Sequence, residues 1–471
     1  MRPGRKIHNQ TRFIQRSNCV SILLMLCIVS FAGCDNGDEE KKDTTPPSKK
    51  IIIDPATTYQ EMTGFGGALS WYSERILNSS KKNEITSLIF NDLGADILRL
   101  KNWYYPDNYP ASKSTATMGD DNSKVLWEAT NQFYTLAKQN NPDLKVLLSS
   151  WGPPAGLKSN GSTRQGMLKK ENGLFMYDAF ATYWADILDN LPFNPDYISI
   201  QNEPSYTNAG WTTSEWAVSD IGSLPGYEQA FDKVYDKIKS RTNPPMMIGP
   251  ESANIAGNTF SGFAEALKNK PHLGMYAYHP YNFGSGATVS QTAAALQAVA
   301  NYANKPNIMT EYSDTFSWFN TAEFINNTLL LANSSGYIYW KLVWAEPAAG
   351  AANAGMVSIS ASGEYNVTPF YYVMKHFAKH IDGGYKRIKA TSVVSGLSIS
   401  AFMNPAQNKL TLIIINSGTE TKTDFEVKDK VINSITADQS KEGSFYKPVD
   451  IADPGTVVLP AQSVTTVVLN I

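Results

Sequence analysis

Between residues 60 and 345, eight short apolar segments alternate with longer amphipathic ones, and no other feature of the sequence limits the fold as strongly. The short segments have the length and the β-branched composition of buried strands, and the longer ones repeat apolar residues at helical spacing. Such alternation indicates a parallel sheet with helices packed outside it. Eight of these units predict a closed (β/α)8 barrel, the α/β fold called a TIM barrel.

The barrel strands are expected at residues 63–69, 95–100, 145–151, 197–203, 246–251, 275–279, 307–311 and 337–341. The helices between them are expected at 81–93, 126–139, 174–190, 227–240, 260–268, 291–302 and 321–332. An open, doubly wound sheet is the main alternative. The first strand carries Gly-Phe-Gly-Gly, but no dinucleotide fingerprint or phosphate loop follows it, so these glycines are interpreted as positions of tight packing.

After about residue 385 the pattern changes to short alternating segments separated by turn residues. This pattern is typical of an antiparallel β-sandwich. We therefore expect the barrel to span residues 61–384 and an appended β-sandwich side domain to span 385–471. Residues 50–60, which precede the barrel, are expected to add one strand to the side domain.

Residues 1–33 have the layout of a lipoprotein signal peptide. Basic residues come first, and the apolar run that follows (VSILLMLCIVSFAG, 20–33) is too short to span a bilayer. Cys34 follows Phe-Ala-Gly, which resembles a bacterial lipobox, so Cys34 is expected to carry a lipid anchor. Residues 34–49 are charged and contain prolines, and are expected to form a flexible tether.

These features predict an exported lipoprotein of a Gram-negative bacterium, anchored in the outer membrane. The acidic start of the tether resembles the export signal of surface lipoproteins, which favours the cell surface as its final place. A plain signal peptide and a signal anchor are the alternatives.

Charge and cysteine content exclude two classes of function. The whole chain has a formal net charge of −2, and removal of residues 1–33 takes away five basic residues and no acidic ones. The mature chain is therefore more negative, and a nucleic-acid partner is not expected. Cys19, Cys27 and Cys34 all lie in the signal region, so the folded part has no cysteine for disulfide or thiol chemistry.

Two glutamates stand where barrel strands are expected to end. Glu203 follows the apolar run at 197–200, and Glu311 ends the segment at 307–311. Working residues of such barrels lie at the carboxyl ends of the strands. Two carboxyl groups about 5–5.5 Å apart can hydrolyse a glycosidic bond with retention. Alternatively, each glutamate caps a helix or pairs with Arg99. The placement of both glutamates, with Asn202 beside one of them, favours the glycosidase interpretation.

These residues resemble the retaining glycosidases with clan A barrels and, more narrowly, glycoside hydrolase family 30. The resemblance covers the chain from about residue 50 onward, including the side sandwich. The motifs that carry it are GFGGALSW (64–71), DILRL (96–100), SSWGPPA (149–155), NEP (202–204), GPES (249–252), TEY (310–312), YIYWKL (337–342) and LPAQSVTTVVLNI (459–471).

The resemblance implies double displacement, with Glu203 as the acid/base and Glu311 as the nucleophile. Arg99 could then stabilise the ionised form of Glu311, and Asn202 would hydrogen-bond the sugar 2-hydroxyl. No cofactor and no metal ion is expected. The residues expected to bind substrate are Asn202, Arg99, Trp71, Trp151, His279, Tyr281 and Trp340.

One further pair of residues has the spacing of metal ligands. His376 and His380 lie four positions apart in HFAKH, but no glutamate stands between them and no third ligand is evident nearby. We therefore interpret them as part of an exposed helix face.

The family contains xylanases, β-1,6-glucanases and glucosylceramidases, and the tail and compact side domain favour an endo-1,4-β-xylanase of plant cell-wall polysaccharide. Xylanases of the family that require glucuronic-acid branches use an arginine in the loop after the eighth strand. Here that loop (LVWAEPAAGAANAG, 342–355) contains no arginine, so strict recognition of the branch is not expected. The alternatives are a β-1,6-glucanase, a glucosylceramidase-like β-glucosidase and a surface lipoprotein that binds glycans without hydrolysing them.

Overall fold

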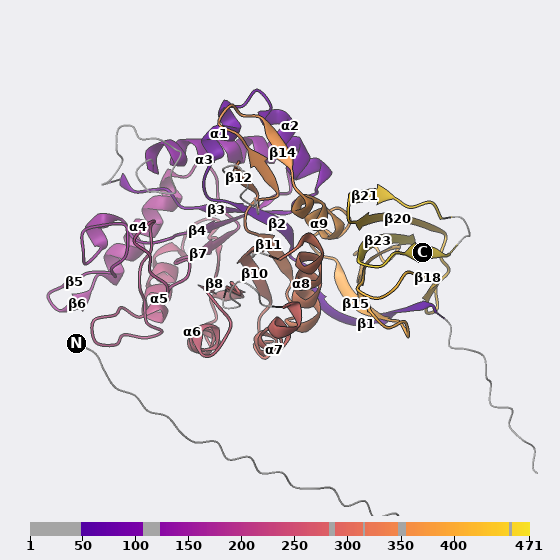
Figure 1. Cartoon of the computed structure of the whole chain (residues 1–471). Helices are drawn as coiled ribbons and strands as arrows, with labels where there is room; N and C mark the ends of the chain where they lie inside the picture. The colour runs from indigo at the N-terminus through magenta and orange to yellow at the C-terminus, as the bar shows by residue number, and fades with distance from the viewer. Residues whose placement is uncertain (1–48, 107–122, 282–287, 314–315, 347–354, 452–454) are drawn as a thin grey trace, which may run out of the picture. The chain divides into compact units, whose positions relative to one another are not determined.

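Eight parallel strands close on themselves in the computed structural model, which describes residues 49–106, 123–281, 288–313, 316–346, 355–451 and 455–471. The strands follow one another around the barrel in chain order, and every neighbouring pair is parallel (Figure 1). The predicted fold class is therefore confirmed. The barrel strands are β2 (Gly64–Leu69), β3 (Ile97–Lys101), β4 (Lys145–Ser149), β7 (Tyr197–Ser199), β8 (Met246–Ser252), β9 (Leu273–Tyr278), β10 (Asn307–Tyr312) and β11 (Gly336–Tyr339).

Apolar side chains fill the inside of the barrel. One buried cluster takes residues from nearly every strand, among them Ala68 of β2, Ile97 of β3, Leu147 of β4 and Ile338 of β11. The residue after Ile97, Leu98, belongs instead to the larger cluster between strands and helices. Side chains of a strand point alternately to its two faces, so each strand contributes to both cores.

Helices surround this sheet between successive strands, as the amphipathic segments predict (Figure 1). They include α3 (Ser123–Asn140), α4 (Tyr177–Asn190), α5 (Tyr227–Ile238), α6 (Thr259–Leu267), α7 (Val289–Val299) and α8 (Trp318–Leu331). After β2 the chain forms α1 (Ser73–Asn78) and α2 (Lys82–Ser87), and α2 continues as the π-helical turn η1 (Leu88–Asp92).

The helix predicted at 174–190 begins later than expected. Leu174–Phe175 is instead the strand β6, paired antiparallel with β5 (Lys170–Glu171). The turn between them is Asn172-Gly173, with φ values of 50° and 83°. An Asn-Gly pair with positive φ makes a tight hairpin turn, and this local preference outweighs the helical pattern.

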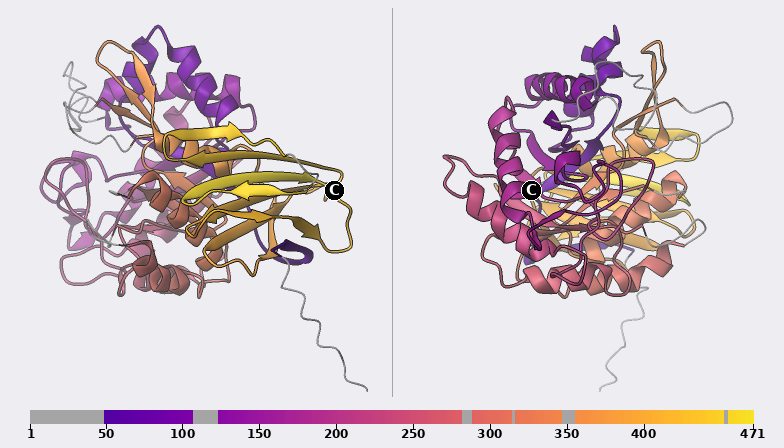
Figure 2. Two further views of the ribbon diagram at one scale, coloured as in Figure 1. Left: turned by 45° about the vertical axis from the view of Figure 1, so that its right-hand side comes forward. Right: turned by 90° about the vertical axis from the view of Figure 1, so that its left-hand side faces the viewer.

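The side domain is a β-sandwich built mainly from the last part of the chain (Figure 2). Its large sheet has the order β19-β1-β15-β16-β17-β23-β20-β21, and β18 pairs with β22 in a small second sheet. The first strand of the chain lies between two late ones, and it pairs parallel with β19, which departs from the antiparallel expectation. The sandwich strands are β1 (Ile51–Glu61), β15 (Lys386–Thr391), β16 (Leu397–Met403), β17 (Lys409–Asn416), β18 (Thr421–Thr423), β19 (Phe425–Val427), β20 (Ser434–Lys441), β21 (Ser444–Pro448), β22 (Val457–Leu459) and β23 (Ser463–Asn470).

The interpretation of His376 and His380 as an exposed helix face is wrong. Both lie at the end of α9 (Pro369–Ala378) or just after it, and His376 is fully buried. Its ring nitrogens lie 2.8 Å from Thr466 Oγ1 and 2.7 Å from Ser440 Oγ, so the ring connects the helix to the sandwich. The side domain covers this face of α9. The spacing of the two histidines does not show which face of the helix is covered.

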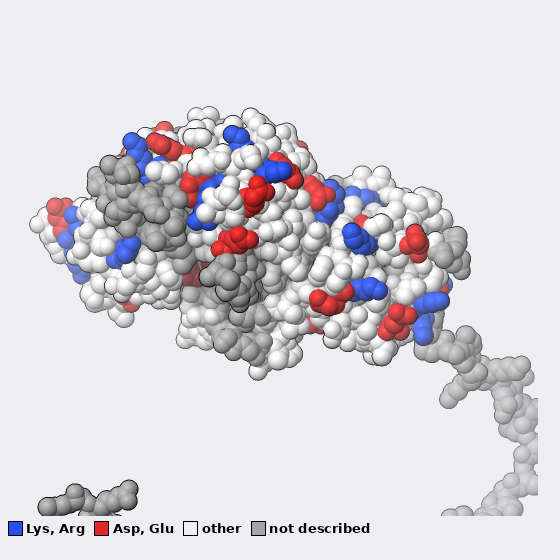
Figure 3. Space-filling model, turned by 45° about the horizontal axis from the view of Figure 1, so that its top comes forward, with Lys and Arg blue, Asp and Glu red and all other residues white. Residues whose placement is uncertain are grey.

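Three further observations concern surface charge, membrane-spanning helices and the N-terminal segment. On the face shown in Figure 3, basic and acidic residues are interspersed rather than gathered by sign. Among the described residues, none of the helices has the length and apolar character that crossing a bilayer requires. The signal peptide, Cys34 and most of the tether lie outside the described residues.

Candidate active site

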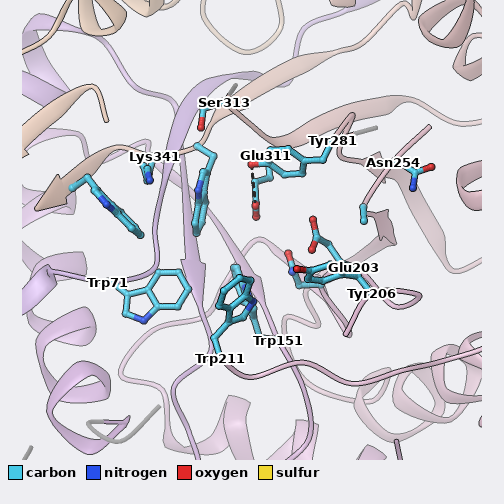
Figure 4. A pocket seen from close by; sticks show the side chains of 14 residues that line it. Trp71, Trp151, Glu203, Tyr206, Trp211, Asn254, Tyr281, Glu311, Ser313 and Lys341 are labelled. Carbon is cyan, nitrogen blue, oxygen red and sulfur yellow. Dashed lines mark hydrogen bonds between the residues drawn. The ribbon is translucent and has the colours of Figure 1, made fainter. Parts of the chain in front are cut away.

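A cavity of about 540 Å³ opens at the carboxyl ends of the barrel strands (Figure 4). Both candidate carboxylates line it, together with several aromatic side chains. The lining residues are Trp71, Trp151, Asn202, Glu203, Tyr206, Trp211, Ala253, Asn254, Tyr281, Glu311, Ser313, Trp340, Lys341 and Trp344. A concave, aromatic cavity with a few carboxylates suits a ligand that is both ring-shaped and rich in hydroxyl groups.

Glu203 and Glu311 approach each other across this cavity. A carboxylate oxygen of one lies within 4.8 Å of a carboxylate oxygen of the other, and each lies within the same limit of a ring nitrogen of His279. The side chain of Glu311 is 8% exposed and that of Glu203 is 13% exposed, so both are largely withdrawn from water but remain open to the cavity. This close approach is compatible with the short spacing of retaining glycosidases, whose carboxyl groups are about 5–5.5 Å apart.

The backbone turns sharply to bring Glu203 into the cavity. β7 ends at Ser199, four residues earlier than the strand that the sequence predicts, and Glu203 has φ 50°. The Asn202 N–H donates to Ser150 O (2.6 Å), and the Glu203 N–H donates to Glu251 O (3.0 Å). A left-handed conformation is unfavourable for glutamate, so these neighbouring backbones must compensate for it, as is common at functional sites.

Arg99 of β3 donates hydrogen bonds to three other residues of the site. Its Nη1 donates to Glu311 Oε2 (2.6 Å), its Nη2 to Asn202 Oδ1 (2.6 Å) and its Nε to Glu251 Oε1 (2.9 Å). The side chain is fully buried, and the ring of Trp151 lies 4.8 Å from the guanidinium carbon. Because Oδ1 of Asn202 accepts from Arg99, the amide nitrogen of Asn202 is the group available to donate to a ligand in the cavity.

His279 and Glu251 lie behind the two carboxylates. His279 Nδ1 is 3.1 Å from Glu203 Oε1, and its Nε2 is 3.8 Å from Glu251 Oε1. Burial alone would lower the pKa of His279, but the charge of Glu311, the hydrogen bond to Glu203 and the nearby carboxylate of Glu251 raise it to about 9. Burial also acts to raise the pKa of Glu251, but Arg99 and His279 outweigh it and hold that pKa far below its ordinary value.

Burial raises the pKa of the Glu311 carboxyl, and the positive charges of His279 and Arg99 oppose this effect. The Tyr281 hydroxyl donates to the other oxygen of Glu311, Oε1, at 3.2 Å (Figure 4). Both oxygens of Glu311 therefore accept hydrogen bonds. Such contacts favour the ionised form that a nucleophile requires.

Tryptophans form one wall of the cavity. Trp71 lies 5.9 Å from both Trp340 and Trp344 between ring centroids, and Trp151 lies 6.3 Å from Trp340. Lys341 follows Trp340 in the chain, and its Nζ lies 3.5 Å from the ring centroid of Trp344. Burial lowers the pKa of Lys341 to about 8, although Glu311 opposes this effect.

The structure brings all nine candidate residues into one cluster but does not put all of them on the cavity wall. Arg99 and His279, expected to bind substrate, are fully buried behind the carboxylates and are not among the lining residues. They contact Glu311, Glu203 and Asn202 instead. The other predicted residues line the cavity: Trp71, Trp151, Asn202, Glu203, Tyr281, Glu311 and Trp340.

Sequence reasoning missed several residues of the site. Trp211 and Tyr206 lie in the loop after β7, where no periodic pattern draws attention to them. Glu251 stands at an expected strand end within GPES, one of the motifs of the resemblance, but its position alone indicated no role. Lys341 lies directly beside the predicted Trp340.

Three of these groups could also be considered as metal ligands. Glu203, His279 and Glu311 each offer one atom within 4.8 Å of the others. His279, however, has a pKa raised to about 9, so at neutral pH both ring nitrogens carry protons and act as donors. A metal ion would have to displace that proton and compete with Arg99 for Glu311. The donor set therefore fits an acid–base site better than a metal centre.

Comparison with known proteins adds two relationships in sequence. The family model described as the glycosyl hydrolase family 30 beta sandwich domain matches residues 384–467. The curated glucuronoxylanase XynC from Bacillus subtilis (strain 168) is 27% identical over 457 residues, which cover 89% of this chain and 92% of that protein.

Solved structures of two proteins show the same fold. A family 30 subfamily 8 xylanase from Clostridium acetobutylicum is 22% identical, with a TM-score of 0.67, and the match covers 90% of this chain and all of the other. An endo-beta1,6-glucanase is 18% identical, with a TM-score of 0.66, over 91% of this chain and 96% of the other.

Proposed function

We propose that this chain, which belongs to glycoside hydrolase family 30, is an endo-1,4-β-xylanase that cleaves its polysaccharide with retention of configuration. The observation that carries the proposal is the approach of Glu203 and Glu311 to within 4.8 Å in a tryptophan-lined cavity. That spacing leaves room for direct attack by a carboxylate on a sugar, whereas an inverting enzyme needs a wider gap for water.

The reaction proceeds in two steps. In the first, an oxygen of the Glu311 carboxylate bonds to the anomeric carbon, the glycosidic bond breaks, and Glu203 gives its proton to the departing oxygen. In the second, Glu203 takes a proton from water, the water oxygen bonds to the anomeric carbon, and Glu311 is released. Tyr281 and Arg99 position the two oxygens of Glu311, and Asn202 donates to the sugar 2-hydroxyl.

Xylan is the proposed substrate because the curated relatives are named glucuronoxylanases. The loop at 342–355 has no arginine to pair with a branch carboxylate, so we propose activity that does not depend strictly on such branches. Residues 347–354 of this loop lie outside the described residues.

The test is a screen of the purified protein against xylans with and without acidic branches, β-1,6-glucan and aryl β-glucosides. We expect the highest rate on xylan, a series of internal cleavage products, and β-anomers as the first products by NMR. Higher activity on β-1,6-glucan would refute the xylan assignment. First products with the α-configuration would refute the mechanism, and binding without any hydrolysis would favour a glycan-binding lipoprotein.

We also propose that Cys34 carries a lipid that anchors the protein in the outer membrane. The support is the signal-like segment before Cys34 and the charged tether after it. Labelling with a fatty acid, followed by membrane fractionation, tests this proposal. A Cys34→Ser variant should lose the label and leave the outer-membrane fraction, and an equally labelled variant would refute it.

A further inference from the structure

The reaction proposed above uses two carboxylates, yet the site contains a third that faces neither the cavity nor the substrate. Glu251 is fully buried in β8, and it is not among the lining residues. Burying an ionised carboxylate is costly unless cations or donors compensate for it. The contacts of Glu251 therefore indicate which groups require its charge.

Glu251 Oε1 contacts both cations of the cluster. It accepts a hydrogen bond from Arg99 Nε at 2.9 Å and lies 3.8 Å from His279 Nε2. The other ends of these two cations reach the catalytic pair: Arg99 Nη1 contacts Glu311, and His279 Nδ1 contacts Glu203. Glu251 is thus the shared partner of the two residues that position the acid/base and the nucleophile.

The backbone of Glu251 also contacts the acid/base residue, Glu203. Its carbonyl oxygen accepts from the Glu203 N–H at 3.0 Å, where Glu203 has φ 50°. Glu251 itself has φ 53°, which is also unfavourable for glutamate. Two strained residues in contact at one site indicate that this arrangement is maintained for function rather than for stability.

A count of charges shows what the third carboxylate does. Arg99 and protonated His279 contribute two positive charges, and ionised Glu251 and Glu311 contribute two negative ones. Among these five side chains, which leave out Lys341 on the cavity wall, the charges therefore cancel when Glu203 carries a proton, which is the state a general acid needs. Without the charge of Glu251 the cluster would be neutral only after Glu203 lost its proton.

We propose that Glu251 is a positioning residue that neutralises Arg99 and His279, so that Glu203 retains its proton as the general acid and Glu311 remains correctly placed. Besides these four residues, Tyr227 of α5 faces Glu251, and the pKa of Tyr227 is raised by burial and by this neighbouring charge. The inference depends on the proposed glycosidase function.

The experiment compares two substrates that differ in their need for an acid. Xylan has a poor leaving group and requires protonation, whereas 2,4-dinitrophenyl β-xylobioside has a leaving group that departs without it. Turnover of both substrates by the wild-type protein is measured first. This measurement tests the proposed glycosidase function independently of the role of Glu251. Each rate is then expressed per active site, counted with a 2-fluoro-xyloside inactivator, so that unfolded protein does not contribute.

For Glu251→Gln we expect kcat on xylan to fall by about 10²-fold and kcat on the dinitrophenyl substrate by about 10-fold or less, with KM changed by less than about threefold. Glu251→Asp, which retains the charge, should restore the wild-type ratio of the two rates. Asp96→Asn is the matched control, because Asp96 is a partly buried carboxylate at the opposite end of β3 that accepts from the Phe65 N–H. It should leave both rates within about twofold of the wild type.

Equal losses on the two substrates, or an unchanged kcat for Glu251→Gln, would overturn the inference. So would an Asp96→Asn variant with the same change in rate ratio, because the effect would then follow from any buried carboxylate.

Discussion

Arg99 Nη1 lies 2.6 Å from Glu311 Oε2, and both side chains are almost completely removed from water. The same guanidinium donates to Asn202 after β7 and to Glu251 of β8. One side chain therefore orients groups from three other barrel strands. An ammonium group is a compact charge with no planar set of donors and cannot make these three contacts in the same geometry.

Arg99→Lys should therefore lower kcat/KM by about 10²-fold and also lower thermal stability, because breaking a buried ion pair costs roughly 3–5 kcal/mol. The measurement is steady-state kinetics with a thermal unfolding curve. Arg387→Lys is the control, because Arg387 is a buried arginine of the side domain that donates to Gln60 and Asn333. It should lose stability but retain kcat, and an equal loss of kcat in both variants would contradict a site-specific role for Arg99.

Replacing the nucleophile gives a chemical signature. Glu311→Ala should lower kcat by about 10⁴-fold or more. Azide can then occupy the space of the missing carboxylate and attack the anomeric carbon of an activated aryl β-glycoside. The expected product is the α-glycosyl azide, identified by NMR.

The matched variant is Glu203→Ala, in which the nucleophile remains. Azide should here attack the glycosyl-enzyme in place of activated water and give the β-glycosyl azide. If the two variants exchanged these products, the roles assigned to Glu203 and Glu311 would have to be exchanged as well.

Lys341 provides a pH-dependent contact in the cavity. Burial lowers its pKa to about 8, so its ammonium form predominates at pH 7 and its neutral form above pH 8. We expect KM for xylan to rise by about 10-fold in Lys341→Met, the loss of one charge-assisted hydrogen bond, with little change in kcat. In the wild type KM should rise above pH 8, and in the variant it should not. Lys379→Met, at a lysine that donates to Asn91 O elsewhere on the barrel, is the control.

The buried His376 should make the protein sensitive to acid. Burial lowers its pKa to about 3, so between about pH 3 and pH 6.5 the unfolded chain binds a proton that the folded chain does not. Stability is therefore complete above pH 6.5 and decreases as the pH falls below it, by roughly 1–2 kcal/mol for this residue between pH 7 and pH 5. Denaturant titrations of the wild type and His376→Asn at both pH values measure the difference. A variant as sensitive to acid as the wild type would contradict this assignment.

The barrel could be predicted because each of its strands has a pattern of its own. Segments such as 145–151 and 307–311 are apolar, short and separated by amphipathic helices, and β4 and β10 lie there. Errors occur where a local preference competes with periodicity. Asn172-Gly173 turns the chain before α4, and β7 ends at Ser199, short of Glu203, which has a left-handed conformation.

The site could be predicted only in part, because the sequence does not say which side chains face the cavity. Arg99 and Glu251 stand at strand ends like Glu311, yet the first two point into the closed interior and Glu311 into the cavity. Trp211 lies in a loop whose path depends on contacts with distant residues, such as Thr213 N with Thr163 O. Contacts of this kind have no sequence pattern.

The first strand of the folded part has its partners near the end of the chain: Ile52 is opposite Thr391, and Ile51 is opposite Phe425. During synthesis β1 therefore emerges several hundred residues before β15 and β19, and it cannot form its ladder until they follow. The large sheet of the side domain can be completed only when β23, at the end of the chain, is present. A prematurely terminated product would keep an unpaired apolar edge that quality-control proteases can recognise.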